Sequence, residues 1–161
     1  MTIKNKITPC LWFDFNAEEA VNFYTSIFNN SRVVNRSYYG DNAPVPKGTL
    51  LTATFELEGQ PLMALNGGPH FKFNEAISLM VSCENQAEVD ELWDKLTADG
   101  GTPSQCGWLK DKFGLSWQIV PVQLEKLMGD KDANKAGAVT QALFKMSKII
   151  IADLEKAYEA A

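Results

Sequence analysis

The sequence is poor in histidine and cysteine, two side chains that often bind metals in proteins. His70 is the sole histidine, and the three cysteines, Cys10, Cys83 and Cys106, lie far apart without a C-x-x-C pair. An odd number of cysteines, scattered along the chain, argues against a disulfide framework and against a zinc knuckle. It favours a reducing environment, so we expect a cytoplasmic protein.

Long apolar runs and clusters of positive charge are also missing. No apolar stretch approaches the roughly eighteen residues that a membrane span requires, and we find no signal-peptide pattern at the N-terminus. Fifteen basic and twenty acidic residues give a net charge of −5, without a basic stripe that could neutralise a phosphate backbone. The sequence therefore predicts neither a membrane nor a nucleic acid as partner.

The chain does contain an internal repeat, which emerges when Tyr24 is aligned with Trp93. In each copy a strand-like stretch leads into an amphipathic helix, "CLWFDFNAEEAVNFYTSIF" in the first and "ISLMVSCENQAEVDELWDKL" in the second. Further strand-like stretches, separated by turn residues, follow each helix. The alternative is a coincidence between two ordinary helix patterns. We expect strand, helix and antiparallel strands in each of two copies.

The repeat suggests how the 161 residues are organised, as one expected domain over 1–161. The first module covers residues 5–68 and the second covers 75–121. Residues 122–161 lie outside the repeat. They predict helices, because apolar residues recur there at three- and four-residue spacing after Asp132, which could cap a helix.

Three stretches resemble a known family: "AVNFYTSIF", "LNGGPHFKFNEAIS" and "CGWLKDKFGLSWQIVP". With the repeat, they resemble the PhnB-like branch of the vicinal oxygen chelate superfamily, which includes glyoxalases, extradiol dioxygenases and bleomycin-resistance proteins. Members of this branch often have the label 3-demethylubiquinone-9 3-methyltransferase. The resemblance implies an α+β fold, in which tandem βαβββ modules form a curled mixed sheet around a cleft. A helical C-terminal tail follows here.

The resemblance also implies where a metal would bind. The superfamily's ligand positions, on inward faces of the strands, correspond to Ala64, Ala76, Gln118 and a position at or next to Pro9. A one-residue slip on the first strand would place Thr8 or Cys10 there, and neither alone would restore a set of ligands. Of the four mapped residues, Gln118 alone has a donor side chain, and a neutral amide without imidazole or carboxylate partners is a poor ligand for a divalent cation. We therefore expect no metal and no other cofactor.

A cleft for a small molecule needs aromatic walls and a few polar groups. Alternation along the strands assigns six side chains to the expected lining. They are Phe13, Asn66, Ser78, Trp108, Ser116 and Gln118. The competing account of the tryptophans is buried core, and we expect Trp117 to pack beneath its helix while Gln118 faces the cleft. Asp111 and Lys112 are interpreted as a charged, solvated turn.

His70 follows a Gly-Gly-Pro turn between the two modules. Imidazole is the usual side chain for acid–base chemistry near neutral pH, so His70 is a candidate catalytic residue at the mouth of the cleft. The alternative is an exposed loop residue or a spacer between the modules. A solitary histidine without a recognisable partner does not decide between them.

Two functions are the main alternatives at this point, and a scaffold in a larger assembly, which would need an exposed apolar patch, is a third. The first is a protein that binds a small molecule in a neutral, aromatic, metal-free cleft without turnover. The second is an enzyme of the lyase, isomerase or oxygenase type, acting on a small carbonyl or aromatic compound, with His70 as acid or base. A methyltransferase is not expected, because the Gly-rich loop that binds an adenosyl cofactor is missing. The resemblance also implies a homodimer, to which the apolar face of the C-terminal helices could contribute.

Overall fold

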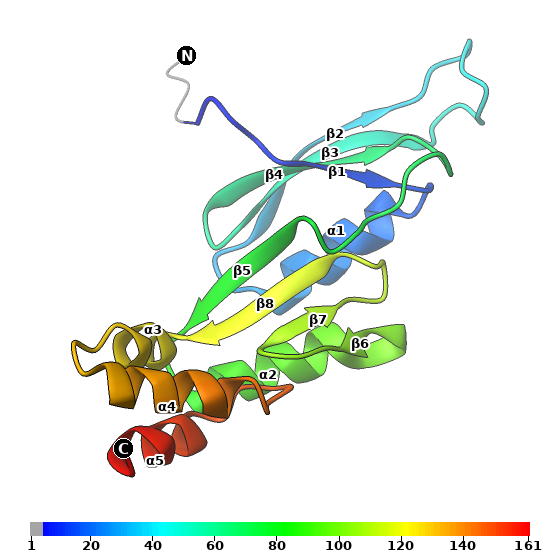
Figure 1. Cartoon of the computed structure of the whole chain (residues 1–161). Helices are drawn as coiled ribbons and strands as arrows, with labels where there is room; N and C mark the ends of the chain where they lie inside the picture. The colour runs from blue at the N-terminus through cyan, green and yellow to red at the C-terminus, as the bar shows by residue number, and fades with distance from the viewer. Residues whose placement is uncertain (1–4) are drawn as a thin grey trace. The chain divides into compact units, whose positions relative to one another are not determined.

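The computed structural model describes residues 5–161, which divide into two compact units after Lys72. In chain order, the first unit contains β1 (Cys10–Phe13), α1 (Ala17–Ile27), β2 (Arg32–Tyr38), β3 (Leu50–Leu57) and β4 (Gln60–Asn66). The strands form one sheet in the order β1-β4-β3-β2 (Figure 1). β1 is parallel to β4, and the other neighbouring strands are antiparallel.

The second unit repeats this arrangement. Its elements are β5 (Ser78–Cys83), α2 (Gln86–Thr97), the short 3-10 helix η1 (Ala98–Gly100), β6 (Thr102–Pro103), β7 (Trp108–Lys110) and β8 (Ser116–Pro121). The strand order is β5-β8-β7-β6, with β5 parallel to β8 and the others antiparallel. The two orders correspond strand for strand. The predicted α+β class and the tandem βαβββ repeat are therefore confirmed.

The two main helices begin differently although they occupy equivalent places. Asn85 caps α2, because its Oδ1 accepts a hydrogen bond of 3.0 Å from the Glu88 N–H. Asn16, at the same place before α1, makes no such side-chain bond. Instead, Asn66 Oδ1 accepts a hydrogen bond of 2.9 Å from the Ala17 N–H. The start of α1 is therefore bonded to the end of β4.

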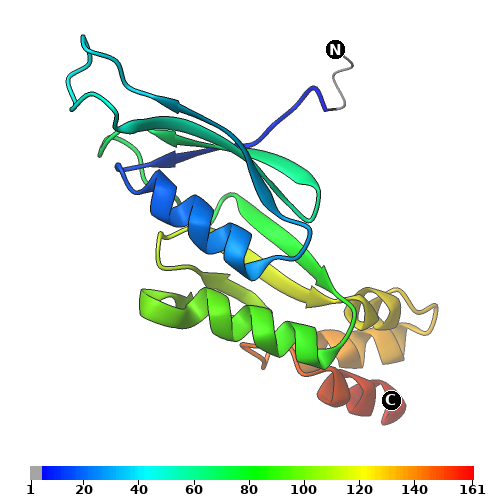
Figure 2. The same cartoon turned by 180° about the vertical axis from the view of Figure 1, so that it is seen from behind.

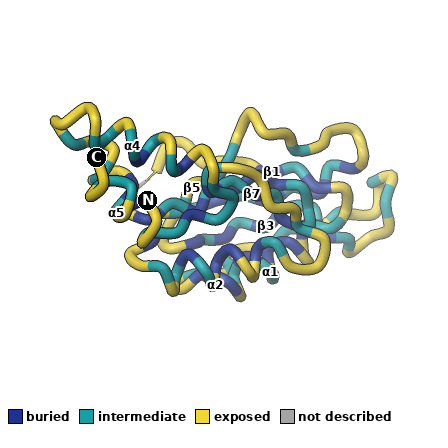
Figure 3. The backbone as a smooth tube through the Cα atoms, turned by 60° about the horizontal axis from the view of Figure 1, so that its bottom comes forward, coloured by how far each residue is buried: buried dark blue, intermediate teal, exposed yellow. Residues whose placement is uncertain are grey.

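Each helix lies along one face of its own sheet (Figure 2). Buried and exposed positions alternate along both helices (Figure 3), as expected for amphipathic helices. The buried positions are Ala17, Ala20, Val21, Tyr24 and Ile27 in α1, and Val89, Leu92, Trp93 and Leu96 in α2. We call the face of each sheet opposite its α1 or α2 the open face.

The residues after β8 form α3 (Val122–Met128), α4 (Ala133–Leu143) and α5 (Ile151–Glu159), as predicted. We call residues 122–161 the C-terminal extension. Asp132 caps α4, because its Oδ1 accepts a hydrogen bond of 3.0 Å from the Asn134 N–H. The apolar face of these helices, considered above as a dimer surface, is instead buried within the unit. It forms a cluster of Leu124, Val139, Leu143, Ile149 and Leu154.

Within residues 5–161, no helix combines the length and the apolar character needed to cross a membrane. The longest, α2, has 12 residues. About 20 apolar residues are needed to cross the hydrocarbon core as a helix.

Candidate functional site

Polar, aromatic and apolar side chains gather on the open face of the second sheet. The strand register pairs Ser78 with Ser116, and it pairs Gln118 with both Met80 and Trp108. Side chains of paired residues point to the same face of a sheet. Met80 is 63% exposed, whereas Ser116 is 1% exposed. The open face therefore combines an accessible apolar side chain with a buried hydroxyl.

The polar groups on this face differ in how they are bonded. The Gln118 Nε2 donates a hydrogen bond of 2.8 Å to the Ser78 Oγ. The Ser116 Oγ is buried and makes no hydrogen bond with any described residue. A buried polar group without a hydrogen bond costs about 1–3 kcal/mol. A ligand atom that bonds this hydroxyl would remove the cost, so Ser116 marks a candidate contact point.

An ion pair lies at the edge of the same face. Lys110 is the register partner of Ser116, and its ammonium group contacts the Glu75 carboxylate. The hydrogen bond from Lys110, together with a backbone hydrogen bond within Glu75 itself, lowers the pKa of Glu75. The two charges compensate each other. The open face therefore gains no net charge from this pair.

The opposite face of the second sheet contains Trp117, which is buried on the side of α2, as predicted. Its Nε1 donates a hydrogen bond of 2.8 Å to the Asp111 Oδ2. The Asp111 Oδ1 accepts further bonds from the Phe113 N–H at 2.9 Å and the Leu115 N–H at 3.1 Å. Asp111 is 2% exposed, so the interpretation of a solvated turn is wrong for this residue. Three donors compensate the burial of its carboxylate.

The open face of the first sheet contains an aromatic pair that the sequence analysis missed. The rings of Trp12 and Phe71 meet edge to face, with 4.9 Å between their centroids. The Trp12 Nε1 donates a hydrogen bond of 2.8 Å to the Gly68 carbonyl. A Cβ on Gly67 would lie 2.3 Å from the Trp12 ring. The Gly-Gly turn thus makes room for the indole and holds it in place.

Phe13 and Asn66 lie on the other face of the first sheet, which corrects the expectation that they face the open side. Both are 2% exposed, and they are register partners. The Asn66 Nδ2 donates a hydrogen bond of 3.0 Å to the Leu50 carbonyl, while its Oδ1 accepts the bond from the Ala17 N–H at the start of α1. A shift of one residue along a strand exchanges its two faces. Trp12, not Phe13, therefore lies on the open face.

His70 lies in the turn after β4 and is exposed. No hydrogen bond or ion pair joins it to another described residue. Its position gives it access to solvent but no group that would orient the imidazole ring or share its proton. The structure thus brings together four of the seven predicted site residues, Ser78, Trp108, Ser116 and Gln118, on one open face.

The four positions implied as metal ligands do not fit a divalent cation. Pro9 and Ala76 have no donor side chain, and Ala64 is fully buried on the side of α1. Gln118 uses its amide nitrogen to bond Ser78. Nowhere in residues 5–161 do three His, Cys, Asp or Glu side chains lie close enough to hold a metal. The donor set is therefore unsuited to the hard or borderline cations that such sites bind.

Comparisons with known proteins give a consistent picture. The family model described as 3-demethylubiquinone-9 3-methyltransferase matches residues 5–120. A solved PhnB protein from Bacillus cereus is 41% identical, with a TM-score of 0.68, and the match covers 73% of this chain and 100% of that protein. No curated protein matches the chain significantly.

Two more distant solved structures share the fold. Protein PA1353 from Pseudomonas aeruginosa is 22% identical, with a TM-score of 0.60, over 73% of this chain and 98% of its own. A mutant of the fosfomycin resistance protein FosX from Listeria monocytogenes, complexed with Mn(II) and dihydroxypropylphosphonic acid, is 17% identical, with a TM-score of 0.56. That match covers 78% of this chain and 98% of FosX. At these identities the likeness shows the fold alone.

Proposed function

Because the chain belongs to the 3-demethylubiquinone-9 3-methyltransferase family, whose solved member from Bacillus cereus is a PhnB protein, we propose that it binds a small organic molecule without a metal. The predicted PhnB-like resemblance is confirmed by the same matches. The proposed contact surface is the open face of the second sheet. The observation that best supports it is the buried Ser116 hydroxyl, which lacks a hydrogen-bond partner among the described residues.

The side chains around Ser116 favour a ligand that is largely apolar and carries a small number of polar groups. Trp108 offers an aromatic surface, and the exposed Met80 offers an adaptable apolar one. Gln118 and Ser78 form a hydrogen-bonded pair that can exchange one partner for a ligand atom. A compact carbonyl or aromatic compound with one hydrogen-bond acceptor would use all of these groups.

The proposal is tested by thermal-shift screening of small carbonyl and aromatic compounds, followed by calorimetric titration of each compound that stabilises the protein. A ligand present at 100 times its Kd adds about 2.7 kcal/mol to the free energy of unfolding, which is readily detected. Ser116→Ala should weaken binding about tenfold or more, because a hydrogen bond is lost. The same variant should not destabilise the free protein, because it removes an unsatisfied hydroxyl.

The matched control is Ser82→Ala. Ser82 lies on the same face, where the register pairs it with Val120, but it is exposed. It should leave both affinity and stability unchanged. Equal affinity of the Ser116→Ala variant and the parent protein for a compound that both bind would refute Ser116 as a contact.

The alternative function, an enzyme acting on a small carbonyl or aromatic compound, depends on His70. We therefore use His70→Ala to separate the two functions. Binding without turnover predicts that the variant keeps the affinity of the parent protein for a screened compound. Catalysis by His70 predicts that the variant still binds the compound but no longer converts it. Chromatography of the reaction mixture measures the conversion.

The methyl transfer suggested by the family's description is not part of the proposal. In each described unit the chain forms a strand, a helix and then three strands. The single parallel pair is β1 with β4 in the first sheet and β5 with β8 in the second. The Gly-rich turn between a strand and the following helix, which holds the phosphate or ribose of a nucleotide cofactor in Rossmann-type proteins, has no counterpart before α1 or α2.

We also propose that the protein forms a homodimer, as the family resemblance implies. The apolar cluster of the C-terminal extension cannot serve as the interface, because it is buried within the second unit. Exposed apolar side chains elsewhere, such as Phe71 and Ile77, are available for an interface. Sedimentation equilibrium at micromolar concentration tests the assembly, and a monomer at that concentration would refute it.

A further inference from the structure

The C-terminal extension lies beyond the residues that match the family, and it bonds to one particular turn of the matched part. This turn, Ser104–Gly107, connects β6 to β7. The Cys106 N–H donates to the Met146 carbonyl and the Gly107 N–H donates to the Ser147 carbonyl, both at 2.8 Å. The Ser147 hydroxyl donates in turn to the Ser104 carbonyl. Two main-chain donors of the turn thus depend on the extension for their hydrogen bonds.

The backbone of the turn is held in an unfavourable conformation at Cys106, whereas the glycine after it tolerates a positive φ. Cys106 has φ 58° and Gly107 has φ 83°. The left-handed region costs a non-glycine residue about 1–2 kcal/mol. The Cys106 thiol also lies 3.6 Å from the Leu143 carbonyl of α4. The extension therefore compensates the strain at Cys106 with several contacts.

Trp108 follows this turn directly and belongs to its hydrogen-bond pattern. The Trp108 N–H donates to the Gln105 carbonyl at 3.0 Å, and the Trp108 carbonyl accepts from the Ser104 N–H at 2.9 Å. The Gly107 carbonyl accepts a bond of 2.8 Å from the Ile119 N–H of β8. A displacement of the turn would therefore move the backbone of Trp108.

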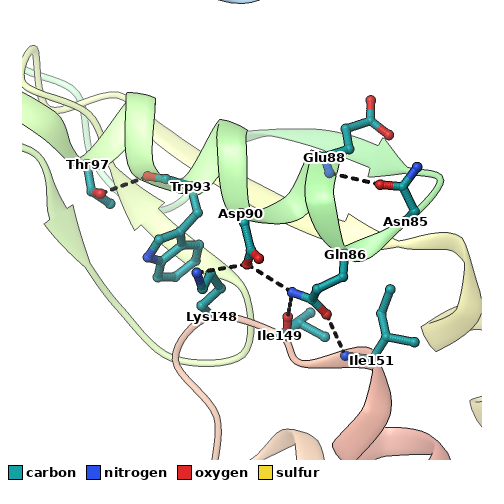
Figure 4. A network of polar contacts seen from close by, with 9 residues as sticks. All are labelled: Asn85, Gln86, Glu88, Asp90, Trp93, Thr97, Lys148, Ile149 and Ile151. Atoms are coloured by element: carbon teal, nitrogen blue, oxygen red, sulfur yellow. Dashed lines mark hydrogen bonds and ion pairs between the residues drawn. The ribbon is translucent and has the colours of Figure 1, made fainter.

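A second set of contacts anchors the extension to the start of α2 (Figure 4). The Gln86 Nε2 donates to the Ile149 carbonyl at 3.1 Å, and its Oε1 accepts from the Ile151 N–H at 2.8 Å. The Lys148 ammonium group lies 2.8 Å from the Asp90 carboxylate. One glutamine side chain thus satisfies both an acceptor and a donor of the extension. These bonds hold the segment that contacts the Ser104–Gly107 turn.

From these contacts we infer that the C-terminal extension positions Trp108 on the open face of the second sheet. The consequence for ligand binding depends on the proposed function, whereas the positioning of Trp108 does not. If a ligand contacts Trp108, its binding and the docking of the extension are linked, and each stabilises the other. Gln86 and Ser147 are then positioning residues, because they act on the ligand through Trp108.

The test uses the full chain with 5-fluorotryptophan in place of tryptophan. Trp108→Phe identifies the Trp108 signal in the ¹⁹F NMR spectrum. The variants are Gln86→Ala, which removes the anchor, and Ser147→Ala, which removes the hydroxyl bond to the turn. Ser147→Thr keeps a hydroxyl and serves as the rescue. Glu91→Ala is the matched control, since Glu91 lies on α2 and pairs with Lys95 rather than with the extension.

We expect Gln86→Ala and Ser147→Ala to shift or broaden the Trp108 signal, while the Trp12 signal, from the first unit, stays unchanged. Amide exchange at Cys106 and Gly107 should become about tenfold faster in these variants, because their acceptors are less well held. Ser147→Thr and Glu91→Ala should resemble the parent protein. If Gln86→Ala does not fold, Ser147→Ala with its rescue still decides the question.

Faster exchange at Cys106 and Gly107 with an unchanged Trp108 signal would overturn the inference, because the extension would then dock without positioning Trp108. An unchanged exchange rate and an unchanged signal in both variants would overturn it as well. A shifted Trp108 signal in a protein that binds none of the screened compounds supports the positioning and refutes the proposed function. A compound that binds the parent protein should bind Ser147→Ala about fivefold more weakly.

Discussion

Gly107 and Gly114 share a left-handed backbone conformation but differ in their surroundings. Their φ angles are 83° and 87°. A Cβ on Gly107 would lie 2.8 Å from the Ile149 Cδ1 and 2.9 Å from the Ile119 carbonyl oxygen, whereas a Cβ on Gly114 would meet nothing within 4 Å. The two glycines therefore separate the cost of the backbone angle from the cost of close packing.

We predict that Gly114→Ala lowers the free energy of unfolding by about 1–2 kcal/mol, the cost of the left-handed conformation alone. Gly107→Ala should cost at least about 1–3 kcal/mol more, because the added methyl group meets a backbone oxygen that cannot move freely. Urea denaturation of both variants measures the difference. Equal losses would show that the extension tolerates the methyl group at Gly107.

Two of the three free cysteines, Cys83 and Cys10, differ in burial and therefore in expected reactivity. Cys83 is buried, and burial together with the nearby Glu88 carboxylate raises the pKa of its thiol to about 12. At pH 8 about one part in ten thousand would be thiolate, which is the reactive form. Cys10 is exposed, although partial burial raises the pKa of its thiol as well.

We predict that Cys83 reacts far more slowly than Cys10 with a disulfide reagent at pH 8. Stopped-flow absorbance should resolve a slow phase that disappears in the Cys83→Ser variant and becomes fast in denaturant. A Cys83 that reacts as fast as Cys10 in the folded protein would contradict its buried position.

At the scale of elements, the turn between β7 and β8 depends on one carboxylate. Asp111 accepts bonds from two main-chain donors of the turn and from the Trp117 indole on β8. It therefore joins the two strands of the hairpin to the core beneath α2. Lys112, its half-buried neighbour, has its Nζ 5.2 Å from the centroid of the Phe113 ring.

Asp111→Ala should lower the free energy of unfolding by about 3–5 kcal/mol, because buried donors lose a charged acceptor. Asp111→Asn keeps one acceptor oxygen and should cost less. Lys112→Ala is the comparison variant and should cost about 1 kcal/mol or less, because an ammonium group over an aromatic ring contributes about 0.5–1 kcal/mol at exposed sites. Chemical denaturation measures all three, and a loss for Asp111→Ala as small as that for Lys112→Ala would contradict the assigned role of the carboxylate.

The C-terminal extension contains a pair of titrating groups that links α5 to the loop between α3 and α4. The Tyr158 hydroxyl donates a hydrogen bond of 2.7 Å to the Asp130 carboxylate. A bond from the Asp132 N–H, together with the Tyr158 bond, lowers the pKa of Asp130 below its ordinary value of 3.8. The Asp130 carboxylate raises the pKa of Tyr158 above its ordinary value of 10.0.

The lowered pKa of Asp130 and the raised pKa of Tyr158 predict two pH ranges in which the protein loses stability. The stabilisation from Asp130 is present above pH 3.8 and is lost as the pH falls through its lowered pKa. The stabilisation from Tyr158 is present below pH 10.0 and is lost as the pH rises through its raised pKa. The difference in urea midpoint between the parent protein and Tyr158→Phe should therefore be largest at intermediate pH. A difference that does not change with pH would contradict this pairing.

At the scale of the whole molecule, the matched part of the chain keeps the family fold without a recognisable set of metal ligands. The implied positions hold a proline, two alanines and a glutamine. The fold therefore persists in this chain with side chains that do not suit a divalent cation.

We predict that Mn²⁺, Zn²⁺ or a chelator changes the thermal midpoint by less than about 1 °C, because a ligand stabilises a protein only if it binds the folded state. Elemental analysis of the purified protein provides a second measurement. A stoichiometric metal together with a lowered midpoint after chelation would refute the metal-free proposal.

The sequence predicted the features that depend on local periodicity. The strand-helix pattern of both modules follows from the spacing of apolar residues around Tyr24 and Trp93, and alternation in β8 correctly placed Trp117 beneath α2 and Gln118 on the open face. Asp132 could be recognised as a cap because its partners are its immediate neighbours in the chain. Such signals are readable because the interacting groups lie within one or two turns of each other.

The tertiary structure alone decided which face of the first sheet is open and which polar groups are buried. The hydrogen bond from the Ala17 N–H to the Asn66 side chain joins residues 49 positions apart. It holds the asparagine on the side of the sheet that α1 covers. The bonds of Gln86 to the extension span more than 60 positions. No pattern in the sequence encodes such contacts, because they depend on the register in which distant segments meet. The amino-acid sequence by itself thus determined the two modules and the helical extension, whereas packing determined which side chains are available to a ligand.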